Sequence, residues 1–189
     1  IATTVDSRGN MAVAWPTAQG VGSSVRLAGA TRWGAPRRVT RTAGAGQPTV
    51  GLGCEGSVVV AWPQAEAAVT SVFATAGAGT DGLLTEPGRI GTYGREDRAL
   101  SITRTPLLGT SGLGFVSWVR EDGDAIGAGS VRGGENGDTR IGGLGFGGIF
   151  RESPAPRFST DGRGLVATTS RTGLTFQEFV PGEDRVRCP

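Results

Sequence analysis

The stretch that decides the fold is Val5-Asp6-Ser7-Arg8-Gly9-Asn10-Met11-Ala12-Val13-Ala14-Trp15. It has the pattern of a strand end, a tight turn, and a second, apolar strand that ends at Trp15. Asp6 and Gly9 are residue types that tolerate positive φ and therefore suit a tight turn. We expect a β-hairpin here.

The same pattern returns three times along the chain. The turn glycine recurs as Gly9, Gly56, Gly112 and Gly164, at intervals of about 47–56 residues. In the first three copies a tryptophan stands six residues after this glycine, and Ser170 takes that place in the fourth. A repeat of roughly 40–50 residues with several strands per unit is typical of β-propeller blades.

Each unit can be divided into four strands, and the units span residues 1–46, 47–98, 99–153 and 154–189. The strands that we expect are Ile1 to Val5, Asn10 to Trp15, Ser24 to Ala28 and Arg37 to Arg41; Pro48 to Gly51, Ser57 to Trp62, Thr70 to Thr75 and Gly88 to Thr92; Ser101 to Thr103, Leu113 to Trp118, Ala125 to Val131 and Thr139 to Gly142; and Arg157 to Ser159, Leu165 to Thr169, Leu174 to Val180 and Arg185 to Arg187. The second strand of each unit is an apolar run, which suits a strand buried on both faces. No segment has a sustained helical period, so we expect no helix.

The predicted fold is therefore an all-β, β-propeller domain over residues 1–189, built from four four-stranded blades. Three arrangements stay open. The four blades close on themselves, they form part of a larger ring of about six to eight blades, or a second chain completes the ring.

Composition limits the partners and the chemistry. The net charge is +2 and only 19% of the residues are charged, which gives no reason to expect a nucleic-acid partner. No apolar run approaches the roughly 20 residues that span a bilayer, so we expect no membrane insertion. The chain contains no histidine, the commonest general base and metal ligand, and we predict no metal and no cofactor.

The two cysteines, Cys54 and Cys188, are far apart in the sequence and have no metal-ligand spacing. One interpretation is a disulfide that ties the C-terminal tail to the second unit, which would imply an oxidising compartment. The other is two unpaired thiols. Only their geometry can decide between these interpretations.

Part of the repeat resembles a known family. The residues Asp6, Gly9, Asn10, Val13, Ala14 and Trp15, followed by Trp33-Gly34 and Pro36, resemble blades of bacterial extracellular β-propellers. Val5 to Pro36 matches best, Val50 to Ala74 matches without the second tryptophan, and the later units match only through their first two strands. The resemblance implies an extracellular or cell-surface location. It does not imply one activity, because propellers include lectins, hydrolases, lyases and docking scaffolds.

Charged residues gather in the loops that a propeller would place together on one face. They are Arg95, Glu96, Asp97, Arg98, Arg120, Glu121, Asp122, Asp124, Arg151 and Glu152. One interpretation is a polar recognition surface for a glycan or a protein loop. The other is solvated loops whose surface ion pairs contribute at most about 1 kcal/mol each.

These observations predict a non-catalytic, secreted or surface-exposed module that binds a protein or a glycan, or supports assembly with further blades or a second chain. The alternative is a carbohydrate-active enzyme, a glycoside hydrolase or lyase that uses loop carboxylates and arginine. Glu121 or Asp122 with Glu96 or Asp97 would then supply two carboxylates about 5–10 Å apart.

The tryptophans have a structural interpretation. Trp15, Trp62 and Trp118 follow apolar strands at matched positions, so we expect them to pack between blades. Trp33 lies in a turn and is the one tryptophan that we expect to be exposed.

Overall fold

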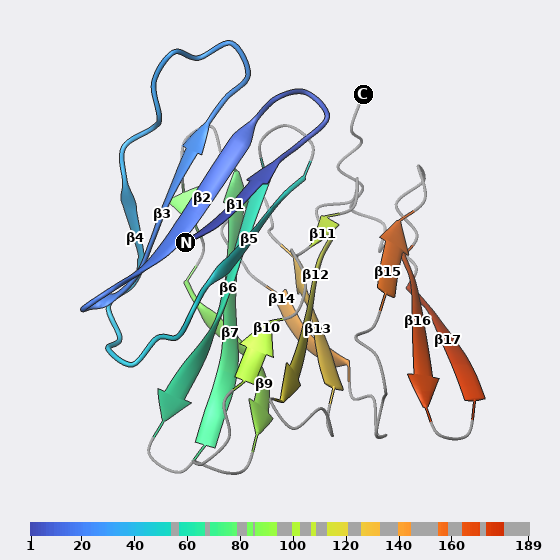
Figure 1. Ribbon diagram of the computed structural model, residues 1–189. Coiled ribbons are helices and arrows are strands. Elements are labelled where there is room, and N and C mark those ends of the chain that lie inside the picture. Colours follow the sequence, from blue (N-terminus) through green and yellow to red (C-terminus); the bar gives the residue numbers. More distant parts are fainter. Residues whose placement is uncertain are drawn as a thin grey trace.

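The strands of the computed structural model form four antiparallel sheets, and each sheet is built from one contiguous part of the chain (Figure 1). The structure describes residues 1–53, 57–66, 69–78, 83–84, 86–93, 100–102, 107–108, 113–120, 126–132, 140–144, 155–158, 164–170 and 173–179. It describes side chains for 1–53, 58–66, 69–77, 86–90 and 116. Every regular element within these residues is a strand, which confirms the predicted all-β class.

Sheet 1 contains β1 (Ala2–Val5), β2 (Met11–Thr17), β3 (Gly20–Arg26) and β4 (Arg37–Thr40), in chain order. The third strand begins earlier than the predicted Ser24. The reason is that β2 continues past Trp15, and Thr17 pairs with Gly20 across a tight turn.

The β1–β2 turn forms where the sequence predicts it. The backbone N–H groups of Arg8 and Asn10 each donate to Asp6 Oδ1 at 2.9 Å, and Asn10 Nδ2 donates to Asp6 Oδ2 at 2.7 Å. Gly9 has a φ of 87°, a conformation that side chains disfavour. Asn10 Oδ1 also accepts from the backbone N–H of Ala28 at 2.8 Å, which ties the turn to the segment after β3.

Sheet 2 contains β5 (Thr49–Leu52), β6 (Ser57–Glu66), β7 (Val69–Ala78), β8 (Leu83–Leu84) and β9 (Gly88–Tyr93). Both β8 and β9 pair with β7. The predicted end of the second strand at Trp62 is wrong, because β6 continues to Glu66 and pairs with β7 along its whole length.

Sheet 3 contains β10 (Leu100–Ile102), β11 (Leu107–Leu108), β12 (Leu113–Arg120), β13 (Ile126–Arg132) and β14 (Arg140–Leu144). Sheet 4 contains β15 (Ala155–Phe158), β16 (Gly164–Ser170) and β17 (Gly173–Phe179). The last predicted strand, Arg185 to Arg187, lies outside the described residues. Sheets 1 and 4 lie at opposite ends of the array, with sheets 2 and 3 between them (Figure 1).

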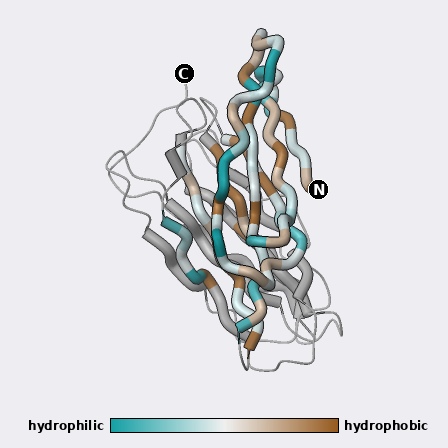
Figure 2. Tube along the Cα trace, turned by 90° about the vertical axis from the view of Figure 1, so that its left-hand side faces the viewer, coloured by the Kyte–Doolittle hydropathy of each residue, from teal (hydrophilic) through white to brown (hydrophobic). Residues whose placement is uncertain are grey.

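The core lies on both faces of sheet 2. On one face, Val58, Val60 and Trp62 form a cluster with residues of sheet 1. On the other face, Val59 and Ala61 form a second cluster that includes Val116 of sheet 3. This two-sided burial explains the apolar run in β6. Figure 2 shows hydrophobic residues recurring along the strands of the first two sheets, interspersed with hydrophilic ones.

The tryptophans differ in their surroundings. Trp62 packs between sheets as predicted, with 1% of its surface exposed, and Trp33 is 45% exposed as predicted. Trp15 is only half-buried, and neither core cluster includes it. Its indole lies over Gly22, where an added Cβ would be 2.7 Å from the ring. No second sheet covers Trp15 among the described residues, so its packing between blades stays a prediction. The Trp118 side chain lies outside the described side chains.

Among the described residues, the structure contains no helix with the length and apolar character needed to cross a membrane.

Candidate functional site

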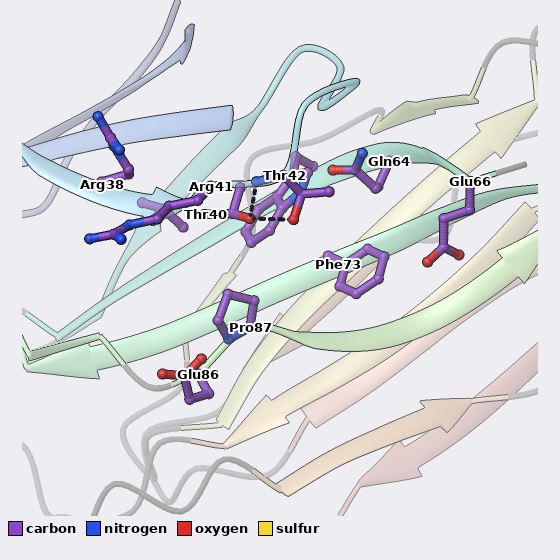
Figure 3. A pocket seen from close by; sticks show the side chains of 11 residues that line it. Arg38, Thr40, Arg41, Thr42, Gln64, Glu66, Phe73, Glu86 and Pro87 are labelled. Carbon is purple, nitrogen blue, oxygen red and sulfur yellow. Dashed lines mark hydrogen bonds between the residues drawn. The ribbon is translucent and has the colours of Figure 1, made fainter. Parts of the chain in front are cut away.

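A cleft of about 590 Å³ lies between sheets 1 and 2, where β4 faces the ends of β6 and β7 (Figure 3). One wall comes from β4 and the residues after it, and the other from β6, β7 and the residues before β9. The lining residues are Arg38, Val39, Thr40, Arg41, Thr42, Trp62, Gln64, Glu66, Phe73, Glu86 and Pro87. This volume is within the usual range of about 300–1,000 Å³ for small-molecule sites.

The extension of β6 builds the second wall. Trp62, Gln64 and Glu66 alternate along the strand, so they share one face of it. Phe73 pairs with Trp62 across the hairpin, and the two rings stack with centroids 6.2 Å apart and an interplanar angle of 17°. Phe73 is half-buried and gives this wall an apolar ring surface next to the buried indole.

Gln64 is the buried polar residue of the cleft, with 3% of its surface exposed. Its Nε2 donates to the carbonyl oxygen of Ala43 at 2.7 Å, which joins sheet 2 to the segment after β4. Within the described residues, Gln64 Oε1 and Trp62 Nε1 are buried without a hydrogen-bond partner. A buried donor or acceptor without a partner costs about 1–3 kcal/mol.

The hydroxyl and carboxylate groups of the cleft are held in place. Thr40 Oγ1 lies 3.2 Å from Thr42 Oγ1 and accepts from the backbone N–H of Thr42 at 3.2 Å (Figure 3). The buried Ser71 donates its hydroxyl to Glu66 Oε2 at 2.5 Å. Arg89 Nη1 lies 3.7 Å from the same oxygen, in a pair whose side chains are 56% and 38% exposed. These contacts fix the Glu66 carboxylate at the mouth of the cleft.

The charges of the cleft are divided between its two walls. Arg38 and Arg41 come from β4 and the residue directly after it, whereas Glu66 and Glu86 come from sheet 2 and the segment before β9. Between them lie the rings of Phe73 and Pro87 and the two threonine hydroxyls (Figure 3). This arrangement suits a ligand that has an apolar face and hydrogen-bonding groups at its edges.

Of the charged loop residues predicted from the sequence, Arg120 alone lies in the part of the chain that the structure describes, so their gathering on one face stays a prediction. Arg120 is the last residue of β12, where its backbone pairs with Leu100. The others lie outside the described residues: Arg95, Glu96, Asp97, Arg98, Glu121, Asp122, Asp124, Arg151 and Glu152. Cys54 and Cys188, the two residues of the predicted disulfide, also lie outside them.

The sequence did not predict the cleft, because the second strand of the second unit was expected to end at Trp62. The available signal was the alternation of Trp62, Gln64 and Glu66 with Pro63 and Ala65, which extends the strand period beyond the tryptophan. The contribution of Thr40 and Thr42 had no local signal, since it depends on which sheets face each other.

Neither metal chemistry nor similarity identifies the site. In the part of the chain that the structure describes, no group of three or more cysteine, aspartate or glutamate side chains is placed to hold a metal ion. No protein-family model matches the chain, and no curated protein is significantly similar to it.

Proposed function

We propose that the chain is a β-propeller segment in which each sheet is one blade, and that it acts as a non-catalytic module that binds a glycan. Three features support the propeller. Each sheet comes from one contiguous part of the chain, the strand order within the sheets largely follows the chain, and sheet 2 packs face to face on sheet 1 and on sheet 3. Propeller blades combine these features.

The observation that carries the binding proposal is the chemistry of the cleft between sheets 1 and 2. A sugar ring has an apolar C–H face and a rim of hydroxyl groups. The rings of Phe73 and Pro87 offer a surface for that face, and Thr40, Thr42 and Arg41 offer hydrogen-bonding groups for the rim. The cleft thus combines an apolar ring surface with a larger set of polar and charged groups around it.

The non-catalytic part of the proposal rests on how the cleft carboxylate is held. Glu66 is engaged by Ser71 and Arg89, an arrangement that suits an ordered hydrogen-bond acceptor. The alternative of a carbohydrate-active enzyme depends on Glu96, Asp97, Glu121 and Asp122, which lie outside the described residues. An enzyme would release new reducing ends or unsaturated products from the glycan that it binds.

We also propose an extracellular or cell-surface location, in keeping with the family resemblance. A disulfide between Cys54 and Cys188 would support it, because such bonds persist in oxidising compartments. Mass spectrometry of the unreduced, proteolysed protein tests for this link.

The binding proposal is tested with an array of immobilised neutral and acidic glycans, followed by affinity electrophoresis with the glycan retained. Arg41→Ala removes an exposed guanidinium from the cleft, and we expect binding to weaken about tenfold, as for the loss of a hydrogen bond from a charged donor. Arg32→Ala is the matched control, because Arg32 is exposed and lies outside the cleft lining.

Failure of every glycan to bind would overturn the proposal, as would equal weakening by the two arginine variants. Turnover of a bound polysaccharide by the wild-type chain would instead favour the enzyme.

A further inference from the structure

The junction between sheets 1 and 2 uses opposite faces of the repeated second strand. Ala12 and Ala14, the third and fifth residues after the turn glycine Gly9, lie in the cluster that faces sheet 2. Val60 and Trp62, the fourth and sixth residues after Gly56, complete that cluster from the other side. In every unit we call the third and fifth positions after the turn glycine the small face, and the fourth and sixth positions the tryptophan face, whichever residues hold them.

The junction between sheets 2 and 3 repeats this arrangement. Val59 and Ala61 hold the small-face positions of the second unit, and they cluster with Val116. Val116 is the fourth residue after Gly112 and therefore holds a tryptophan-face position. The small face of one sheet thus packs on the tryptophan face of the next at both junctions, so the sheets stack head to tail.

This order leaves the tryptophan face of sheet 1 without a partner among the described residues. Met11, Val13 and Trp15 share that face of β2, are half-buried, and belong to neither core cluster. Val5, which pairs with Met11, is exposed. A groove of about 390 Å³ lies beside the Trp15 indole. In the second unit, the equivalent Val60 and Trp62 are fully buried by sheet 1.

We propose that a second copy of the chain covers this surface with the small face of its sheet 4. In β16, the small-face positions are held by Ala167 and Thr169, which are small residues like Ala12 and Ala14. The chain's own sheet 4 lies at the far end of the array from sheet 1 (Figure 1). The contact continues an interface that already occurs twice within the chain.

A contact of this kind joins two different surfaces, so it either closes into a ring or grows into a filament. Two copies of the described part, with four sheets each, would give eight sheets, which is within the usual range of about four to eight blades for a closed propeller. A closed pair would leave no unpartnered sheet face. This inference does not require the cleft to bind a glycan, and its test involves no ligand.

The test is the molar mass of the chain, measured by light scattering and sedimentation across micromolar concentrations. We expect the mass of two chains. Val13→Arg places a charge on the tryptophan face, and Thr169→Arg places one at a small-face position; each should weaken association by about a hundredfold, because a charge buried at an interface without a partner is costly. Ser7→Arg is the control, because Ser7 lies in the exposed β1–β2 turn.

Mixing the two variants distinguishes a head-to-tail contact from a symmetric one. The Val13→Arg chain keeps an intact sheet 4 and the Thr169→Arg chain keeps an intact sheet 1, so the mixture should regain an association that neither variant shows alone. Three results would overturn the proposal: a single-chain mass for the wild type, a pair that survives Val13→Arg in a folded protein, or a Thr169→Arg chain that still pairs with itself. Circular dichroism establishes that each variant is folded.

Discussion

Sheets 1 and 2 contain the same repeated hairpin but stabilise it by different interactions. In sheet 1 the turn is held by the Asp6 carboxylate and the Asn10 amide, and one sheet face is packed. In sheet 2 the corresponding positions are Gly53 and Ser57, and both sheet faces are packed. Among the described residues, sheet 1 therefore combines side-chain hydrogen bonds at its turn with one packed face, whereas sheet 2 is buried on two sides. Single substitutions in the two sheets test this contrast.

The largest effect is expected at the equivalent tryptophans of the two hairpins, Trp15 in sheet 1 and Trp62 in sheet 2. Trp62→Ala should lower the free energy of unfolding by about 3–5 kcal/mol, because it leaves a cavity between two packed sheets and removes the stacking on Phe73. Trp15→Ala should cost only about 1–2 kcal/mol, because its side chain is half-buried. Urea unfolding in dilute solution, followed by circular dichroism, measures both values. Equal losses would mean that the two tryptophan faces are equally covered.

An intermediate effect is expected at the polar turn of sheet 1. Asn10→Ala should lower the free energy of unfolding by about 1–3 kcal/mol, because it removes the buried Asn10 amide together with its hydrogen bonds to the backbone N–H of Ala28 and to one oxygen of Asp6. Ser7→Ala is the control at an exposed position of the same turn, with an expected change within about 0.5 kcal/mol. A loss at Asn10 no greater than at Ser7 would remove the contrast between a hydrogen-bonded and a packed hairpin.

The same contrast explains what the sequence could predict. Local patterns were sufficient for the all-β class, for the turn at Asp6 and Gly9, and for most of the strands in the first two units. The repeat predicts the same burial for the side chains of Trp15 and Trp62, although Trp15 is half-buried and Trp62 is fully buried. That difference depends on whether a sheet is at the end of the stack or inside it, and no residue near either tryptophan encodes this position.

The candidate site was harder to predict than the fold, because the charged residues that the sequence singles out lie in expected loops. The described cleft is formed by strand faces. Gln64 reaches it because backbone pairing of β6 with β7 continues beyond Trp62, and its amide is anchored by Ala43 from the segment after β4. Contacts between residues so far apart in the sequence arise from sheet stacking, which periodicity within one strand does not specify.

The smallest effect is expected where sheet 2 extends beyond the packed hairpin. Glu66→Gln retains an oxygen that can accept the Ser71 hydroxyl and removes only the partly exposed ion pair with Arg89. The free energy of unfolding should fall by no more than about 0.5 kcal/mol, the usual value for a surface ion pair. Urea unfolding at low and high salt provides the measurement, and salt should erase any difference from wild type because an exposed pair is screened. A loss comparable to that of Asn10→Ala, unchanged by salt, would mean that this end of β6 is stabilised by a buried charge network. The end of β6 at the cleft would then belong to the buried part of sheet 2 and not to a solvated wall.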